Sequence, residues 1–80
     1  MSYRPFVEYV VGAVIERPDM LEIEEEVSGN VRTFNVHVAQ EDVGKLIGKG
    51  GRVVSAIRSV VSCIAAKSKE KAFVKIVTDN

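Results

Sequence analysis

Three glycines fall within four residues of this 80-residue chain, in the string IGKGGR at positions 47–52. Because glycine has no side chain, a phosphate backbone can approach the main chain closely at such a string. If a helix begins where the string ends, its free amides and the positive end of its dipole would attract the negative charge. The spacing therefore favours the binding of phosphate groups. The candidate residues are Gly48, Gly50 and Gly51, with the cations Lys45, Lys49 and Arg52.

Two other phosphate-binding motifs do not fit these residues. A P-loop needs four residues between its first glycine and Gly-Lys, then Ser or Thr, whereas only three residues separate Gly44 from Gly48 and Gly50 follows Lys49. The dinucleotide fingerprint needs a strand leading into the loop and a different glycine spacing. Nucleotide hydrolysis and dinucleotide binding are therefore not expected. The remaining alternative is a tight turn between two helices that binds no ligand, although one or two glycines would suffice for it.

Helical patterns flank the glycine string on both sides. A short helix is expected after Ala39 and as far as Gly48, with the acidic Glu41 and Asp42 in its first turn, where the helix dipole favours negative charge. A longer helix is expected over about residues 52–69, with one apolar stripe. The apolar positions are Val43, Leu46 and Ile47 in the short helix, and Val53, Val54, Ile57, Val60, Val61 and Ile64 in the long one.

The rest of the chain shows one further helical pattern and three strand patterns. Apolar residues at steps of three and four predict a helix that begins near Phe6, with Pro5 in its first turn and Pro18 as its stop. Alternation with a period of two predicts three strands, the first two of which form a hairpin around the turn at residues 28–30. The predicted strands are residues 20–27, 31–38 and 72–77.

This order of elements, α-β-β-α-α-β, predicts the fold class. Leu21, Ile23 and Val27 are expected on the buried side of the first strand, with three glutamates on the other side. The economical arrangement is a three-stranded sheet with the helices packed on one face. We therefore expect one α+β domain of two layers over residues 1–80.

The charges of the chain cancel, but they are unevenly distributed. Eleven basic and eleven acidic residues give zero net charge, which taken alone argues against a nucleic-acid binder. Residues 1–42 hold three basic and nine acidic residues, whereas residues 43–76 hold eight basic and one acidic. Nucleic acid is therefore expected on the half that contains the glycine string, with the acidic hairpin turned away. The lysines of the far C-terminal part are more simply solvated surface than direct contacts. They are Lys67, Lys69, Lys71 and Lys75.

Several functional classes are excluded by what the chain lacks. With Cys63 as its one cysteine and His37 as its one histidine, it cannot form an internal disulfide or a Cys/His zinc site, and a reducing cytoplasmic setting is expected. We expect no membrane association, because no apolar run approaches the ~18 residues of a membrane span and no export signal is recognised. We also expect neither an enzyme nor a cofactor, since there is no nucleophile with a base and no pair of carboxylates in a cleft.

The residues around the glycine string resemble those of a known family. The string DVGKLIGKGGR at 42–52, followed by AIR at 56–58, is similar to the helix, GXXG loop and helix of the KH domain. The order α-β-β-α-α-β matches the type II, prokaryotic topology of that family and not the order of type I. The resemblance covers nearly the whole chain, and it is strongest to the short stand-alone bacterial KH proteins.

The resemblance implies a groove that clamps about four nucleotides of single-stranded RNA. Ile47 would form part of its floor. Gly48 and Gly51 would be the two defining glycines, and Lys49 and Gly50 between them would present charge and backbone to the phosphates. The flanking contacts would be Lys45 and Arg52, with Arg58 as a further candidate.

We therefore expect a non-catalytic RNA-binding protein of low sequence specificity, because the chain has no tryptophan and few aromatic residues on which bases could stack. The resemblance further implies an RNA chaperone or post-transcriptional regulator linked to cell elongation and cell-envelope homeostasis. It also implies a homodimer, or a pair with a second KH protein of the Jag or KhpB kind. The alternative is a protein-interaction or assembly module that keeps the KH fold and binds no RNA.

Overall fold

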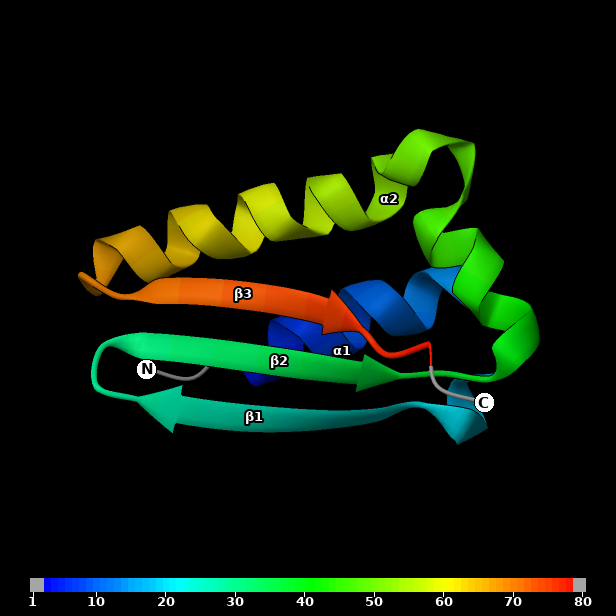
Figure 1. Ribbon diagram of the computed structural model, residues 1–80, viewed down its shortest axis with the longest axis horizontal. Helices are drawn as coiled ribbons and strands as arrows, with labels where there is room; N and C mark the ends of the chain where they lie inside the picture. The colour runs from blue at the N-terminus through cyan, green and yellow to red at the C-terminus, as the bar shows by residue number, and fades with distance from the viewer. Residues whose placement is uncertain (1–2, 79–80) are drawn as a thin grey trace.

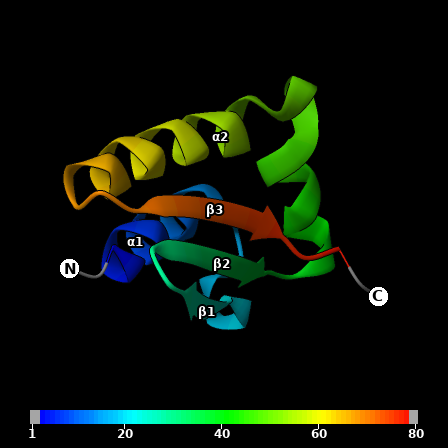
Figure 2. The same ribbon diagram turned by 60° about the vertical axis from the view of Figure 1, so that its left-hand side comes forward.

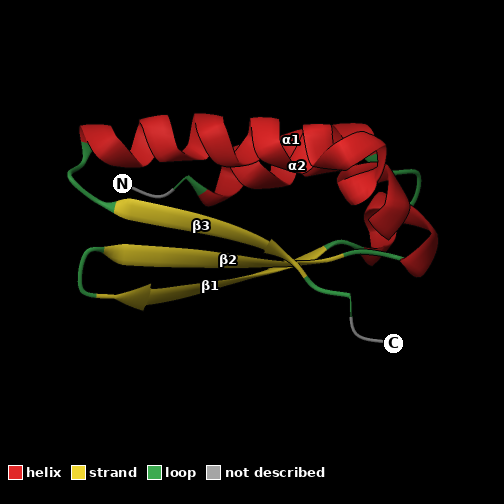
Figure 3. Ribbon diagram, turned by 45° about the horizontal axis from the view of Figure 1, so that its top comes forward, coloured by secondary structure: helices red, strands yellow, loops and turns green. Residues whose placement is uncertain are grey.

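The computed structural model describes residues 3–78, apart from the side chain of Lys49. One layer is a three-stranded sheet, and both long helices lie on the same face of it (Figure 3). This arrangement confirms the predicted α+β fold with two layers. The elements are α1 (Arg4–Val14), the short 3-10 helix η1 (Pro18–Met20), β1 (Glu22–Ser28), β2 (Val31–His37), α2 (Gln40–Lys67) and β3 (Lys71–Ile76).

The sheet has the order β1-β2-β3, with β2 in the centre. β1 pairs with β2 in an antiparallel manner and forms the predicted hairpin, whose turn is Gly29 and Asn30. β3 runs parallel to β2 on its other side (Figure 1). Because parallel neighbours need a long crossover, α2 connects the end of β2 to the start of β3 and packs along β3.

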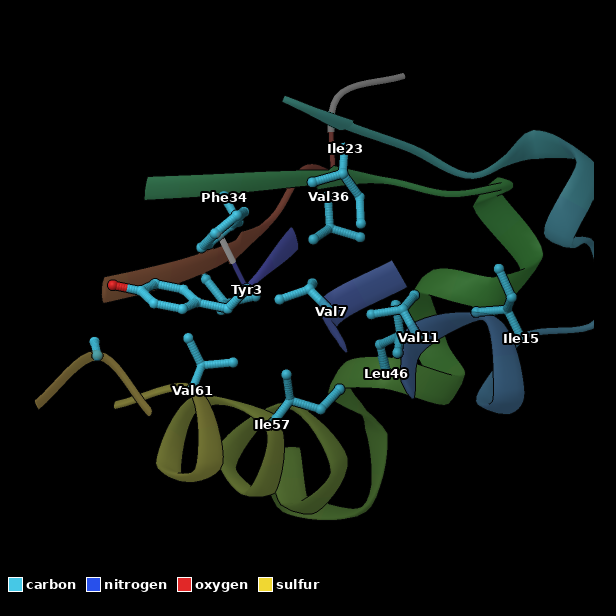
Figure 4. Packing of buried hydrophobic residues seen from close by; sticks show 12 residues of the cluster. Tyr3, Val7, Val11, Ile15, Ile23, Phe34, Val36, Leu46, Ile57 and Val61 are labelled. Carbon is cyan, nitrogen blue, oxygen red and sulfur yellow. The ribbon is translucent and has the colours of Figure 1, made fainter. Parts of the chain in front are cut away.

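The helices and the helix-facing side of the sheet share one apolar core (Figure 4). Val7 and Val11 of α1 are fully buried, as the predicted apolar stripe requires, and the Tyr3 ring lies 6.0 Å from that of Phe34. Each fully buried side chain of this size contributes roughly 1.5–3 kcal/mol relative to an exposed one. The sheet contributes Ile23, Phe34, Val36 and Val74, and α2 contributes Leu46, Val54, Ile57, Val61 and Ala65.

Two of the sequence-based expectations for the N-terminal half are wrong in detail. α1 already ends at Val14, because Ile15 turns to extended geometry (φ −87°, ψ 158°) and is buried in the core. Pro18 therefore opens η1 and does not stop the helix. Val27 was expected on the buried side of β1 but is 58% exposed. Its neighbour in β2 is Arg32, so charged side chains occupy the face at this end of the sheet.

Two expectations for the C-terminal half also need correction. β3 spans Lys71–Ile76, one residue earlier than the predicted strand at 72–77. Val60, which belongs to the predicted apolar stripe of the long helix, is 45% exposed. Ile57 and Val61 lie on the side of α2 that faces the core, and Val60 lies beyond the edge of that side.

Candidate nucleic-acid interface

The glycine string lies at a sharp bend of α2 (Figure 2). Gly50 and Gly51 both have φ of 73°, a left-handed conformation that residues with a side chain rarely adopt. Two successive residues of this kind cannot continue a regular α-helix, so the chain changes direction and returns along the sheet. We call residues 40–49 the first arm of α2 and residues 52–67 the second arm. The two predicted helices thus follow each other without a separate loop, as one element with two arms.

Asp42 holds the first arm in place. Its side chain is completely buried, and its two carboxylate oxygens accept hydrogen bonds from the backbone amides of Glu16 and Arg17, each at 3.0 Å. The sequence predicted Asp42 only as a charge in the first turn of a helix. The structure shows that it joins that turn to the segment after α1, and no local pattern could reveal a partner 25 or 26 residues away. The exposed Glu41 adds a looser ion pair with Arg17, at 3.5 Å.

A cavity of about 510 Å³ lies beside the first arm, where β2 and β3 end. Ile47 lines it and is 44% exposed, so it presents an apolar surface to the cavity. The family resemblance implied Ile47 as part of a groove floor. It did not indicate the opposite side of the cavity, because that side is formed by residues near 37 and 77, which meet only in the folded chain. The other lining residues are His37, Val38, Gln40, Val43, Gly44, Val77 and Thr78.

Gly48 lies at the end of the first arm, next to Ile47. Its φ is not positive, and a Cβ atom added to it would meet nothing within 4 Å. Neither backbone conformation nor packing therefore requires glycine there. Because glycine inside a helix costs roughly 0.5–1 kcal/mol relative to alanine, Gly48 lowers the stability of the fold without an internal reason. Gly48 is half-buried, and the space beside its Cα atom is free of protein atoms.

The predicted cations of the loop surround the bend. Lys45 and Arg52 are both exposed, and Lys45 lines a second cavity together with Val53, in the angle between the two arms. The backbone of Lys49 lies within the first arm, and its side chain is outside the described part of the structure. The structure thus brings together Lys45, Ile47, the three glycines and Arg52 around one turn of chain.

Arg58 is placed differently. Its Nε donates a hydrogen bond of 2.9 Å to the carbonyl oxygen of Val74 in β3. It lines a third cavity, between the second arm and the free edge of β3, and not the one that contains Ile47. Arg58 is therefore a neighbour of the bend along the second arm, and it also holds this arm to the sheet.

Four acidic side chains lie on β1, and Glu41 lines the cavity between the two arms together with Lys45. Glu24 is 3.1 Å from Nε2 of His37, and Glu26 accepts a hydrogen bond of 2.8 Å from Asn35. β1, which carries both glutamates, is the edge strand on the side away from β3 and α2 (Figure 1). The acidic hairpin is therefore turned away from the second arm, as the charge distribution predicted.

A second polar cluster, of Tyr3, Glu25, Arg32 and Glu70, lies at the other end of the sheet from the bend (Figure 1). The Tyr3 hydroxyl donates a hydrogen bond to Glu70, and Arg32 donates one of 3.1 Å to the same carboxylate. These bonds, that from Tyr3 first, lower the pKa of Glu70 below its ordinary value of 4.5. Burial, and then the bond to Glu70, raises the pKa of Tyr3 above 10.0. The cluster fixes the turn before β3.

The described part of the chain shows neither a candidate metal site nor a candidate membrane span. Among residues 3–78, no group of three or more His, Cys, Asp or Glu side chains is arranged to hold a metal ion. Within the same range, no helix combines the length and the apolar character needed to cross a membrane.

The order of the elements, the mixed sheet and the glycine bend define a type II KH domain. The family model described as "KhpA/KhpB, KH domain" matches residues 4–76, and the chain belongs to this family. No solved structure gives a significant match.

Curated relatives from three bacterial genera carry one name, "RNA-binding protein KhpA". The chain is 39% identical over 61 residues to "RNA-binding protein KhpA" of Mycobacterium leprae, a match that covers 76% of each chain. It is 37% identical over 71 residues to the protein of that name from Caldanaerobacter subterraneus subsp. tengcongensis, covering 89% of this chain and 95% of the relative. The protein of that name from Chlamydia caviae is 30% identical over 76 residues, covering 95% and 97%.

Proposed function

We propose that this protein binds single-stranded RNA in the groove formed by the first arm of α2, the glycine bend and the start of the second arm. Its membership of the KhpA/KhpB family and the names of its relatives support this proposal. The groove combines an apolar wall, an open backbone and exposed cations, which are the parts that a KH domain needs to clamp about four nucleotides.

The observation that carries the proposal is the unfilled space at Gly48. The fold requires glycine at the bend itself, where Gly50 and Gly51 have positive φ, but it has no such requirement at Gly48. Gly12 and Gly44 are equally open helical glycines, so open space alone does not indicate a ligand. Gly48 differs from Gly12 in its position beside the exposed Ile47 and the bend, where a ligand that approaches the backbone accounts for a glycine. A turn without a ligand, the alternative considered for the sequence, explains Gly50 and Gly51 but leaves Gly48 unexplained.

In the proposed complex, the phosphates lie against the bend and the bases against the cavity. Backbone amides at the start of the second arm and the side chains of Lys45, Lys49 and Arg52 bind the phosphates, because a helix N-terminus and cations both favour negative charge. Ile47 provides an apolar surface for one base. The chain has no tryptophan and few aromatic residues on which bases could stack, so binding tolerates many sequences.

The wider role follows from the family resemblance. We propose a non-enzymatic RNA chaperone or post-transcriptional regulator that acts in the cytoplasm and is linked to cell elongation and envelope homeostasis. A single KH groove holds few nucleotides, so useful affinity needs a second groove nearby. A homodimer, or a pair with a second KH protein of the KhpB kind, supplies that groove.

The test compares two Gly→Asp variants in an RNA-binding titration at low and moderate salt. Gly48→Asp places a carboxylate in the proposed phosphate site. Gly12→Asp makes the same change in α1, where an added Cβ also meets nothing within 4 Å. We expect Gly48→Asp to weaken binding at least about tenfold, or ~1.4 kcal/mol, through repulsion of the phosphates. Gly12→Asp should bind like the native protein.

Two outcomes would refute the proposal. Equal affinities of the two variants would show that RNA does not approach Gly48. If the native protein binds no single-stranded RNA even at low salt, the assembly module that keeps the fold without RNA binding becomes the better description.

A further inference from the structure

The helices lie on one face of the sheet and leave the other face open (Figure 3). On that open face, β3 carries a large apolar side chain, Phe73. Phe73 is 51% exposed. It alternates with Ala72 and Val74, which pack toward the helices, so its own side chain lies on the open face. A single exposed apolar residue is ordinary on a protein surface. The exposure of Phe73 therefore becomes informative only through its neighbours.

Two lysines flank Phe73 on the same strand and the same face. Lys71 and Lys75 are both exposed and lie two residues before and after it, roughly 6.6 Å away along the strand on either side. The residue beside Phe73 in β2 is Thr33, which is small and uncharged. An aromatic ring between cations is the combination with which proteins hold single-stranded nucleic acid: a base stacks on the ring and phosphates meet the cations.

The charges across the open face favour a polyanion on β3. The carboxylates of Glu24 and Glu26 lie on β1 and contact His37 and Asn35 of β2. β2 separates them from β3, and two strand spacings amount to about 10 Å. A phosphate backbone is therefore repelled from the β1 edge and attracted to the β3 edge.

Phe73 is also connected to the groove of the proposed function. With Arg58, Ser62 and Lys75 it lines a cavity of about 420 Å³ along the free edge of β3. With Ser62, Lys71 and Glu70 it lines the next cavity, of about 350 Å³, where the Glu70 carboxylate accepts hydrogen bonds from Tyr3 and Arg32. Arg58 is itself a candidate RNA contact. An RNA strand that leaves the bend along the second arm therefore reaches Phe73 by crossing the edge of β3.

We propose that Phe73, Lys71 and Lys75 form a second contact for the same RNA molecule, outside the glycine groove. An unpaired base stacks on the Phe73 ring, and the two lysines bind the phosphates on either side of it. This inference rests on the proposed function, since it extends the path of the RNA from the groove to the open face of the sheet. It also assigns a role to two lysines that the sequence indicated only as solvated surface.

The test measures the affinity for two single-stranded RNAs, one of about four nucleotides that fills the groove alone and one of about twelve. Phe73→Ala should weaken binding of the longer RNA roughly 5- to 140-fold, the equivalent of about 1–3 kcal/mol for one stacked base. Binding of the shorter RNA should not change. Phe73→Tyr should keep the affinity, whereas Phe73→Leu, which keeps an apolar surface without a ring, should lose it.

Tyr9→Ala is the matched control, because Tyr9 is 78% exposed on α1, in the helical layer on the other side of the sheet. It should bind both RNAs like the native protein. The inference is wrong if Phe73→Ala binds the longer RNA with native affinity, or if it weakens both RNAs equally. If the native protein binds neither RNA, the proposed function fails, and the second contact fails with it.

Discussion

The Nε atom of Arg58 donates a hydrogen bond to the carbonyl oxygen of Val74 and so joins the second arm of α2 to the free edge of β3. The bond gives this arginine a structural role beside the RNA contact that the family resemblance implies for it. We expect Arg58→Ala to lower the free energy of unfolding by about 1 kcal/mol, because a single hydrogen bond is lost. Urea denaturation measures this change, and an unchanged midpoint would show that the bond contributes nothing.

Arg58→Lys separates the two roles. A lysine keeps the positive charge but cannot reproduce the geometry of the guanidinium. If Arg58 acts on RNA through its charge, this variant should lose stability and retain most of the RNA affinity. A loss of RNA affinity as large as that of Arg58→Ala would contradict an effect of charge alone.

Alanine at Gly48 should strengthen the fold and weaken the complex. Replacing a helical glycine whose surroundings are open should raise the free energy of unfolding by roughly 0.5–1 kcal/mol. The added methyl group, however, occupies the space through which the phosphate backbone approaches. Gly12→Ala, in α1, is the control: it should raise stability similarly and leave RNA affinity unchanged. The prediction is checked by thermal unfolding together with RNA titration, and it fails if both variants bind RNA equally well.

Alanine at Gly50 should have the opposite effect on stability. Its φ of 73° is left-handed, so alanine there costs about 1–2 kcal/mol even though the surrounding space is empty. Gly50→Asn should cost less, because asparagine tolerates this conformation better. Urea unfolding curves of Gly50→Ala, Gly50→Asn and Gly48→Ala measure whether the free energies of unfolding follow this order. If Gly50→Ala unfolds with the same free energy as the native protein, the bend adopts another geometry in solution.

Loss of the Asp42 carboxylate should be the most damaging of these changes. Asp42→Ala leaves two backbone amides without their charged acceptor, at a cost of about 3 kcal/mol. Glu41→Gln, its neighbour in the chain, removes only an exposed ion pair with Arg17 and should cost less than about 1 kcal/mol. Chemical denaturation compares the two, and similar effects would show that the buried hydrogen bonds are not a main support of the first arm.

The hydrogen bonds of Glu70 should make stability depend on pH. Its pKa is lowered in the folded protein, so the carboxylate contributes stability above the unfolded value near 4.5 and loses it as the pH falls through the folded pKa. The pKa of Tyr3 is raised, so its contribution is complete below pH 10.0 and is lost above that value.

Glu70→Gln removes the acidic group and should flatten the decline of stability below about pH 4.5. Tyr3→Phe should flatten the decline on the alkaline side in the same way. The midpoint of urea denaturation, measured across the pH range, tests both variants. An acid slope that is the same in native protein and in Glu70→Gln would assign the effect to other carboxylates.

Much of the fold is predictable from local patterns. The period-two alternation around Phe34 and Val36 identified a strand with one buried side, and the stripe of Val7 and Val11 identified an amphipathic helix. The residues of the glycine string identified the position of the bend. These features depend on neighbours within a few positions, which is why the sequence contains the signal.

Other features depend on contacts between distant segments. The sequence placed Val27 in the core by alternation alone, whereas the structure exposes it because Arg32 lies opposite. The family resemblance implied that Arg58 contacts RNA, but nothing in the sequence indicated its hydrogen bond to Val74, which is 16 residues away. The cavity beside Ile47 could not be foreseen, because its walls come from the end of β2, the segment after β3 and the first arm.

The sequence by itself determined the elements, their order and the loop whose chemistry suits phosphate, because propensity, periodicity and glycine content are local properties of the chain. Only the tertiary structure decided that no neighbouring atom requires glycine at position 48, and that Phe73 lies between two lysines on the face of the sheet away from the helices. Both depend on which surfaces remain uncovered after packing, and burial is a property of the whole fold.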